Sequence, residues 1–293
     1  MMASTLFHKH YPPASPAFRL LVETQVRAAL EEDIGEGDLT AALLPENQTA
    51  KADIVCREYA VICGIPWATE CFSLLDTSIK IQWLVHEGEE ILPGQILCHM
   101  QGMTRALLTA ERCALNFLQT LSATATETRK YVKLVQGTKA EILDTRKTIP
   151  HMRLAQKYAV TIGGGKNQRL ALYDGILIKE NHIASAGSIE KVLKAAQQKN
   201  TDVQIEVENL SQLQQAIEAG AKSILLDNFD LNGMTQAVKL TNGRAILEVS
   251  GGVNLATVSA IAETGVDRIS IGGLTKNINA IDLSMRITAI GVG

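Results

Sequence analysis

The stretch Ala140-Glu-Ile-Leu-Asp-Thr-Arg-Lys-Thr148 contains a short apolar run that ends on Asp144 and is followed directly by Arg146 and Lys147. At least five later runs also end on a polar, charged or glycine residue: 175–178 on Lys179, 203–207 on Glu208, 223–226 on Asp227, 245–249 on Ser250 and 268–271 on Gly272. Parallel strands that carry functional groups at their carboxyl ends are typical of an α/β barrel of the TIM type. The pattern predicts such a barrel, with a site at that end.

Segments with helical spacing of apolar residues separate these runs. They predict helices from about residue 152 and over 188–199, 211–219, 231–240 and 255–263. Strands that alternate with helices imply a parallel sheet with right-handed crossovers. Six strands follow from the pattern and a seventh fits near Val160, so the sequence is compatible with an incomplete barrel as well as a closed one. A last helix is predicted over 278–287.

The first half of the chain has a different rhythm. A helix is predicted over 18–32, and residues 49–103 fit short strands and turns around one helix over 65–75. The stretch 85–97 resembles the hairpin of a lipoyl- or biotin-carrier domain but has no lysine at its tip, which favours a purely structural α+β sandwich. A long helix over 104–136 follows. We expect a sandwich domain with this bridging helix (1–125), the α/β barrel (126–276) and a terminal helix that packs back on the sandwich (277–293).

Composition excludes several classes of function. The chain has 293 residues, 46% hydrophobic and 20% charged, and a net charge of −3, so it fits a soluble globular protein that binds neither nucleic acid nor a membrane surface. Aromatic residues make up 4%, too few for platforms that stack single-stranded nucleic acid. No run reaches the roughly 20 apolar residues that span a bilayer, and no secretory signal is recognisable. The five cysteines form no CxxC pair, so we expect reduced core thiols in a cytoplasmic protein.

The residues expected at the carboxyl end of the barrel are rich in cations. Arg146 can bind a carboxylate or phosphate through two hydrogen bonds and Lys147 adds a point charge, although a surface salt bridge is the alternative. Gly163-Gly164-Gly165 would let backbone N–H groups approach an anion, or would form a flexible turn. Arg169 follows four residues later. These groups suit a highly anionic substrate.

Carboxylates are expected at the same end. Glu206 and Glu208 alternate along one strand and therefore share a face, and Asp227 ends the next strand. They could pair with lysines, bind Mg²⁺ or stabilise an oxocarbenium ion. Lys179 could bind phosphate, form a Schiff base or lie at the rim of the barrel.

Two glycine pairs stand where barrel enzymes bind phosphate. Ser250-Gly251-Gly252 and Gly272-Gly273 each come before a predicted helix. Backbone N–H groups and the positive end of a helix attract a phosphate group in the last loops of such barrels. This is the most specific signal that the residues give without any comparison.

Seven motifs in this order resemble the quinolinate phosphoribosyltransferase family, the decarboxylating nicotinate-nucleotide pyrophosphorylases. They are DTRKT (144–148), GGGKNQR (163–169), IKENH (178–182), EVEN (206–209), LLDNF (225–229), EVSGG (248–252) and ISIGGLT (269–275). The upstream stretches EEDIGEGDLT (31–40) and LLTAERCALNFLQTLSATAT (107–126) are similar to the same family. The resemblance covers nearly everything after residue 20.

The resemblance implies a reaction of quinolinate with phosphoribosyl pyrophosphate and Mg²⁺ that gives nicotinate mononucleotide, pyrophosphate and CO₂ in de novo NAD biosynthesis. It implies that Lys147, Glu208 and Asp227 are catalytic, and that the two carboxylates help to place Mg²⁺. It also implies a homodimer or larger assembly in which Arg112 completes the partner's site. The full set of implied substrate-binding residues is Arg112, Thr145, Arg146, Lys147, Gln168, Arg169, Lys179, Glu208, Asp227, Ser250, Gly251, Gly252, Ser270 and Gly272.

The chain departs from the family pattern at three places. Gln168 stands where the family usually has histidine, and glutamine cannot become cationic. His151 replaces a common glycine, and LSATAT (121–126) replaces LSGIAT. Three other functions remain open: a relative that uses nicotinate or another base, a Schiff-base lyase with Lys179, and a binding barrel without catalysis. The pair of arginines at 146 and 169 favours a dicarboxylate over nicotinate.

Overall fold

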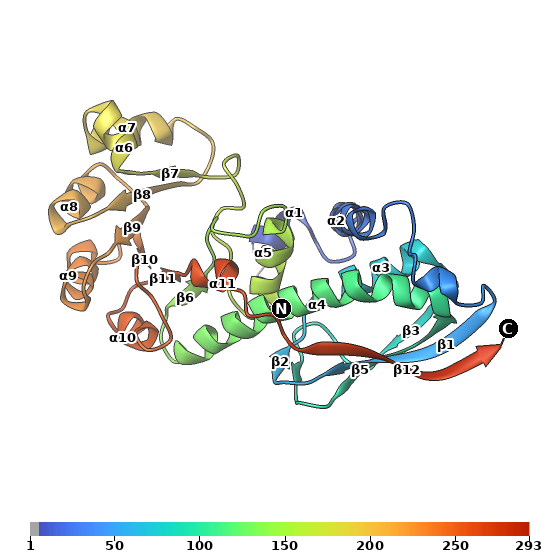
Figure 1. Cartoon of the computed structure of the whole chain (residues 1–293). Coiled ribbons are helices and arrows are strands. Elements are labelled where there is room, and N and C mark those ends of the chain that lie inside the picture. The colour runs from blue at the N-terminus through green and yellow to red at the C-terminus, as the bar shows by residue number, and fades with distance from the viewer. Residues whose placement is uncertain (1–5, 293) are drawn as a thin grey trace. The chain divides into compact units, whose positions relative to one another are not determined.

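The computed structural model describes residues 6–292, and the chain divides into two compact units (Figure 1). The first unit comprises the residues up to Glu127 together with Pro150–Gly163 and the residues from Asn277 onward. The second unit comprises Thr128–Ile149 and Gly164–Lys276. The predicted barrel range of 126–276 includes 150–163, so the division by contacts differs from it there.

The first unit is built on an antiparallel sheet. Within the described residues its strand order is β12 (Leu283–Val292), β1 (Gln48–Cys56), β5 (Ile96–Met103) and β3 (Lys80–Trp83). Alternate residues of β1 are buried, as expected for a sheet with one face on a core. The helices of the unit are α1 (Leu6–His10), α2 (Pro16–Ile34), the 3₁₀ turn η1 (Ala41–Leu43), α3 (Ile65–Leu75), α4 (Thr104–Leu134, which continues into the second unit) and α5 (Arg153–Ile162). A small pair of strands, β2 (Ala60–Val61) and β4 (Glu90–Ile91), completes it.

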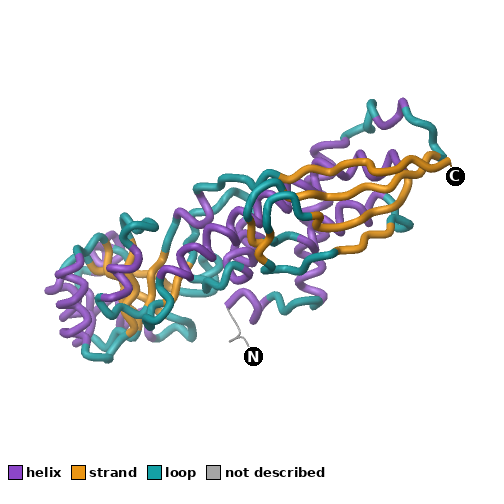
Figure 2. Tube along the Cα trace, turned by 90° about the horizontal axis from the view of Figure 1, so that it is seen from below, coloured by secondary structure: helices purple, strands orange, loops and turns teal. Residues whose placement is uncertain are grey.

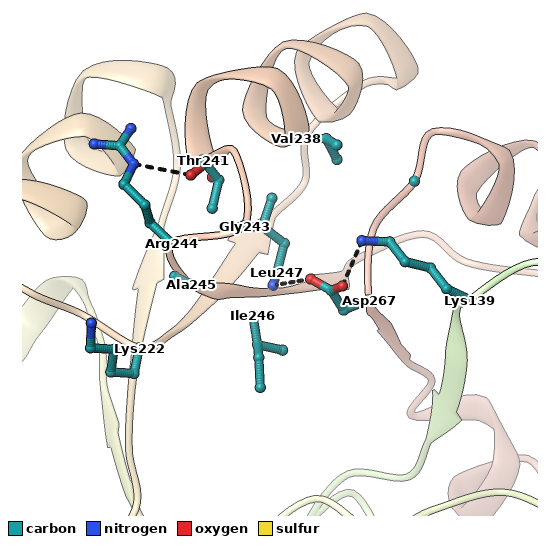
Figure 3. Close-up of a pocket in the computed structure, with 11 residues that line it drawn as sticks. Lys139, Lys222, Val238, Thr241, Gly243, Arg244, Ala245, Ile246, Leu247 and Asp267 are labelled. Carbon is teal, nitrogen blue, oxygen red and sulfur yellow. Dashed lines mark hydrogen bonds and ion pairs between the residues drawn. The ribbon is translucent and has the colours of Figure 1, made fainter.

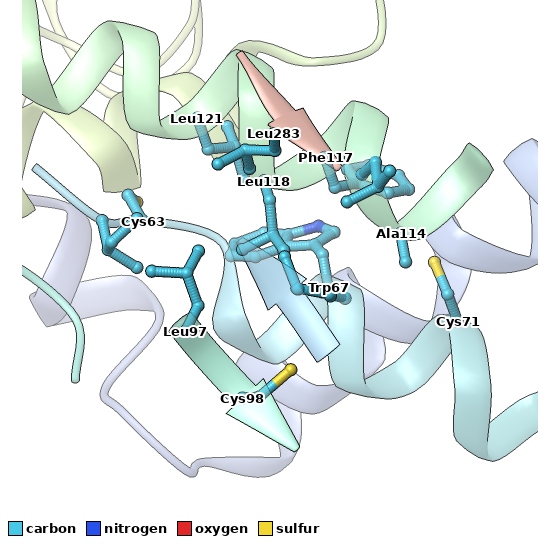
Figure 4. Packing of buried hydrophobic residues seen from close by; sticks show 14 of the residues in the cluster. Cys63, Trp67, Cys71, Leu97, Cys98, Ala114, Phe117, Leu118, Leu121 and Leu283 are labelled. Atoms are coloured by element: carbon cyan, nitrogen blue, oxygen red, sulfur yellow. The ribbon is translucent and has the colours of Figure 1, made fainter. Parts of the chain in front are cut away.

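One hydrophobic core joins this sheet to its helices. Figure 4 shows Trp67 of α3 among Leu97 of β5 and Leu118 of α4, and all three side chains are fully buried. The Tyr158 ring of α5 packs 5.3 Å from the Trp67 ring, measured between centroids. This contact explains why α5 belongs to the first unit although the chain reaches it from the barrel. The expected α+β sandwich is confirmed.

The prediction of a helix over 278–287 is wrong. These residues end in strand β12, which pairs antiparallel with β1 from Leu283↔Cys56 to Val292↔Gln48. Leu283, Met285 and Ile287 alternate with period two, and the apolar spacing that also fits a helix is overridden because β1 offers an edge with unpaired backbone groups. The pairing joins residues more than 200 positions apart, which a local sequence pattern does not reveal.

The second unit is a parallel α/β sheet. In the described part of the chain its order is β6 (Glu141–Leu143), β11 (Arg268–Ser270), β10 (Ile246–Ser250), β9 (Ser223–Asp227), β8 (Val203–Val207) and β7 (Ile176–Ile178). The connecting helices are α6 (Glu180–Ala186), α7 (Ile189–Gln197), α8 (Leu210–Glu218), α9 (Leu231–Thr241), α10 (Val258–Glu263) and α11 (Gly273–Lys276). Helices α7 to α10 lie outside the curved sheet (Figures 1 and 2).

The sheet is an incomplete barrel. Among the described residues β6 and β7 lie at the two ends of the strand order, and beyond β6 a single parallel bridge joins Leu143 to Lys166. The prediction of a seventh strand near Val160 is wrong, because Val160 lies in α5, where all six residues 155–160 are buried. The six strands inferred from the apolar runs are confirmed, at positions within one or two residues of those predicted.

Candidate active site

The carboxyl ends of the strands bring most of the predicted residues of the second unit to one level. The register pairs Val207 with Leu226 and Asp227 with Ser250. On the other side of β10 it pairs Val249 with Ile269, and Ser270 with Leu143. Glu208, Asp227, Ser250, Gly272 and the loop that follows Leu143 are therefore neighbours along one edge of the barrel, as the sequence predicted.

Two arginines lie close together at this edge. Burial lowers the pKa of the Arg169 guanidinium, the nearby Arg146 guanidinium lowers it further, and Asp174 raises it. Arg169 Nη1 donates to the Gly175 carbonyl oxygen at 3.0 Å. The Nε atoms of both arginines are buried and have no hydrogen-bond partner among the residues that the structure describes. Two adjacent cations with unpaired buried donors form a site for an anion that carries more than one carboxylate or phosphate oxygen.

The loop after β6 is fixed against helix α11 and the residue that precedes it. The Lys147 N–H donates to Thr145 Oγ1 at 3.1 Å, and Thr275 Oγ1 donates to the Lys147 carbonyl oxygen at 2.7 Å. A Cβ atom at Gly272 would lie 2.9 Å from Lys147 Cδ and 3.5 Å from Thr145 Oγ1. Glycine at 272 therefore lets the Lys147 side chain lie across the end of β11.

Lys179 is held by a carboxylate. Its Nζ donates to Glu206 Oε2 at 2.7 Å, and the Glu206 side chain is 9% exposed. The backbone N–H of Lys179 donates to His182 Nδ1 at 3.0 Å, at the start of α6. The expectation that carboxylates in the barrel are paired with cations is confirmed for Glu206.

Glu208 and Asp227 are the carboxylates at the ends of β8 and β9. Glu208 is exposed, and its backbone N–H donates to Gln212 Oε1 at 2.8 Å. Asp227 Oδ2 accepts from Asn228 Nδ2 at 2.8 Å. In the part of the chain that the structure describes, no group of three or more His, Cys, Asp or Glu side chains could hold a metal ion.

The loop Ser250-Gly251-Gly252 has a backbone that suits glycine. Its φ values are 102° at Gly251 and 64° at Gly252. A Cβ atom at Gly251 would lie 2.1 Å from Asn228 Oδ1, whereas Gly252 has open space around it. The Asn228 N–H donates to the Ser250 carbonyl oxygen at 3.1 Å, which ties this loop to the end of β9.

The two glycine pairs stand at different distances from the next helix. Helix α11 begins at Gly273, directly after Gly272, whereas α10 begins only at Val258, after a turn.

Ser270 is buried, and its Oγ donates to the Val249 carbonyl oxygen at 3.4 Å. The structure thus places Ser270 between strands β10 and β11.

Gln168 points into the barrel. Its Nε2 donates to Glu248 Oε1 at 2.7 Å and to Gln204 Oε1 at 3.3 Å. Gln204 Nε2 in turn donates to Glu248 Oε2 at 3.0 Å. The sequence analysis missed Glu248 and Gln204 as candidates, although a glutamate inside the apolar run 245–249 was a visible signal.

Arg112 belongs to the first unit. It lies on α4, where it is exposed, and its charge lowers the pKa of Glu111, whereas burial raises that pKa by more. Its predicted role in a partner's site stays a prediction.

A hollow of about 240 Å³ lies at the opposite, amino end of the strands (Figure 3). Three of the four charged side chains that line it have structural partners: Lys139 pairs with Asp267 at 2.7 Å, and Arg244 donates to the Leu240 and Thr241 carbonyl oxygens at the end of α9. Asp267 also accepts from the Leu247 N–H at 2.8 Å. These contacts close the bottom of the barrel, away from the residues predicted from the sequence.

Among the described residues, none of the helices combines the length and the apolar character needed to cross a membrane. The five cysteines are free thiols and all are buried, as expected. Burial raises the pKa of Cys98 to about 12 and that of Cys113 to about 11.

Comparisons with known proteins cover nearly the whole chain. Residues 38–122 match the model of the quinolinate phosphoribosyl transferase N-terminal domain, and residues 124–286 match that of the C-terminal domain. A probable nicotinate-nucleotide pyrophosphorylase [carboxylating] of Bacillus subtilis is 40% identical over 88% of this chain and 90% of its own length. A mitochondrial quinolinate phosphoribosyltransferase [decarboxylating] of Nicotiana tabacum is 37% identical over 94% of this chain and 84% of its own.

Solved structures of similar proteins have the same fold. That of the nicotinate-nucleotide pyrophosphorylase from Francisella tularensis has a TM-score of 0.89 and 46% identity over 92% of this chain and 97% of its own. The structure of a nicotinate-nucleotide pyrophosphorylase from Pyrococcus furiosus, at 15% identity and a TM-score of 0.68, is similar in fold. The fold of this chain is thus shared with nicotinate-nucleotide pyrophosphorylases of known structure.

Proposed function

Because the chain belongs to the quinolinate phosphoribosyltransferase family, we propose that it transfers the phosphoribosyl group of phosphoribosyl pyrophosphate to quinolinate. The products are nicotinate mononucleotide, pyrophosphate and CO₂, and the reaction belongs to NAD biosynthesis. The observation that carries the proposal is the pair Arg146 and Arg169, whose buried Nε atoms have no partner among the described residues. Quinolinate has two neighbouring carboxylates, which match two neighbouring guanidinium groups.

The rest of the edge suits the second substrate. Backbone N–H groups of Gly251, Gly252 and Gly272 would receive the 5′-phosphate, and Ser250 would add a hydroxyl donor. Lys147 and Lys179 would bind pyrophosphate or the departing carboxylate. A basic edge in a chain of net charge −3 concentrates two polyanions at one place.

The mechanism rests on position and charge. The pyridine nitrogen of quinolinate attacks the ribose carbon from which pyrophosphate leaves. Asp227 and Glu208 would stabilise an oxocarbenium-like centre and bind the ribose hydroxyls. Mg²⁺, held by these two carboxylates and by the pyrophosphate, would neutralise charge on the leaving group. The transfer reaction needs no general base. Decarboxylation follows once the ring nitrogen is quaternary. The bond from the ring to the leaving carboxylate breaks, the cationic ring stabilises the electron pair that CO₂ leaves behind, and a proton from water takes the place of CO₂ on that carbon.

We further propose that the enzyme is a cytoplasmic homodimer or larger assembly in which Arg112 reaches the partner's site. The free buried thiols support a reducing compartment, and the exposed guanidinium on α4 supports a contact beyond the protomer. Arg112→Ala should lower activity and leave the fold intact. Mixing it with an Asp227→Ala variant should restore part of the activity, because mixed dimers contain one complete site. Gel filtration that shows an active monomer would contradict the proposal.

The first experiment measures product formation with phosphoribosyl pyrophosphate, Mg²⁺ and either quinolinate or nicotinate. We expect nicotinate mononucleotide and CO₂ from quinolinate only. Turnover with nicotinate alone would move the protein to a different specificity within the same fold. Lack of turnover with both bases would leave a binding protein, and trapping of a carbonyl ligand on Lys179 by borohydride would indicate a lyase.

A further inference from the structure

The polar chain Gln168–Glu248–Gln204 crosses the interior of the barrel. Gln204 lies on β8 and Glu248 on β10, and strand β9 separates them in the sheet. Gln168 follows Lys166, whose bridge lies on the other side of β6. Side chains from such distant strands meet only where they point inward from the curved sheet, so these three hydrogen-bonded side chains are part of the barrel core.

Glu248 fixes the orientation of the two glutamine amides. Its side chain is fully buried, and each of its oxygens accepts one amide N–H, from Gln168 at 2.7 Å and from Gln204 at 3.0 Å. A carboxylate only accepts hydrogen bonds, so the NH₂ group of each glutamine must face it. Gln204 is fixed further because its Nε2 also donates to Ser223 Oγ at 3.1 Å.

Both hydrogens of the Gln168 amide are therefore engaged. One is directed at Glu248 and the other at Gln204 Oε1. The carbonyl oxygen of the amide must then point away from Glu248. Without the carboxylate the amide could turn by 180° at little cost, because its two ends have almost the same shape.

We infer that Glu248 is a positioning residue for recognition of the pyridine substrate: it holds in one orientation the amide of Gln168, the residue that directly precedes Arg169. The inference rests on the proposed function and adds a residue to it. Glu248 does not touch the substrate in this scheme. It removes the cost of ordering Gln168 when the substrate binds.

Glu248→Gln tests the inference. The new amide keeps one acceptor, so it can hold only one of the two NH₂ groups, and the constraint on the orientation of the Gln168 amide is weakened. We expect the KM for quinolinate to rise about fivefold, or about 1 kcal/mol at 1.4 kcal/mol per tenfold. The KM for phosphoribosyl pyrophosphate and kcat should stay within about twofold of the wild-type values, since the ribose end is unchanged. Glu263→Gln, at an exposed glutamate on α10, is the matched control.

A double-mutant cycle separates positioning from a purely structural role. If Glu248 acts through Gln168, then Glu248→Gln should add nothing to the KM of a Gln168→Met variant. Additive effects, or a Glu248→Gln enzyme with the wild-type KM for quinolinate, would overturn the inference. Gln204→Met provides a second route if Glu248→Gln does not fold, because it keeps the carboxylate and removes only the longer contact to Gln168. It should raise the same KM by more than about twofold but by less than the roughly fivefold expected for Glu248→Gln, and a smaller change counts against the inference. A wild-type enzyme that does not turn over quinolinate would remove the proposed function and this inference together, whereas an active wild type with an unaffected Glu248→Gln removes only the inference.

Discussion

Gly251→Ala should damage the site in two ways, because it strains the backbone at residue 251 and displaces the Asn228 side chain. A φ of 102° is a conformation that L-residues rarely adopt, and holding alanine there costs about 1–3 kcal/mol. The new Cβ would also lie 2.1 Å from Asn228 Oδ1 and 2.9 Å from Asn228 Cγ. Rotation of the Asn228 side chain would relieve the first contact, but only by breaking its hydrogen bond to Asp227. The Asn228 backbone nitrogen lies 3.2 Å from the new Cβ, so the backbone at residue 251 has little room to shift.

The expected loss combines strain with a released carboxylate. A hydrogen bond to a charged group contributes about 1.5–3 kcal/mol, and the lower end applies because Asn228 is exposed. With part of the strain absorbed by the loop, about 2 kcal/mol should appear in catalysis, or roughly a 30-fold fall in kcat/KM for phosphoribosyl pyrophosphate. The midpoint of thermal unfolding should fall by about 4–8 °C. Steady-state kinetics with saturating quinolinate and a thermal melt measure the two effects.

Gly252→Ala is the matched control. Its φ is 64° and no atom lies within 4 Å of the position that a Cβ would take, so only the left-handed conformation is penalised, by about 1 kcal/mol. We expect about a fivefold loss at that position. Asn228→Gly should make Gly251→Ala better tolerated, because it removes the clashing side chain at a residue that already has a φ of 56°. Equal losses in the two alanine variants would refute the steric argument.

Three other predictions concern stability. Lys179→Met leaves the buried Glu206 carboxylate without its cation and should lower the free energy of unfolding by about 2 kcal/mol, measured by chemical denaturation. Adding Glu206→Gln should recover most of this loss, and an unchanged stability of Lys179→Met would contradict the prediction. Burial raises the pKa of Glu87, so its neutral form is favoured in the folded state. The wild type should therefore lose stability as the pH rises from about 4.5 through this raised pKa, whereas Glu87→Gln should show a flatter profile, and parallel profiles from pH 4 to 8 would contradict this. Gly102→Ala places a methyl group 2.6 Å from Ile79 Cγ1 and should destabilise the chain by about 1–3 kcal/mol in the same denaturation assay.

The strand ends were predictable because their signal is local. Each apolar run stops on a polar residue, and the register then aligns those residues, as Asp227↔Ser250 shows. Helix α3 was predicted at the observed bounds of Ile65–Leu75, since Pro66 at the start and a dense apolar face leave little ambiguity. Local patterns thus sufficed wherever an element begins and ends for reasons contained in its own residues.

The errors share a different cause. Strand β12 forms because β1 offers it an edge, and α5 joins the first unit because Tyr158 packs on Trp67. Both depend on partners far away in the sequence. Spacing alone fits a helix through Ile278, Ile281 and Met285 and equally a strand through Leu283, Met285 and Ile287. Only the partner decides between them.

Glu248 shows where a sequence can suggest more than its motifs. A glutamate inside a buried strand is costly unless its oxygens are satisfied, so its presence predicts that inward-facing polar groups must meet it. The structure supplies Gln168 and Gln204. Because Gln168 directly precedes Arg169, we infer that the Glu248 carboxylate inside the barrel core also determines which way this amide faces. Core and site are therefore coupled in this chain, and a substitution at either glutamine should be assessed together with the carboxylate between them.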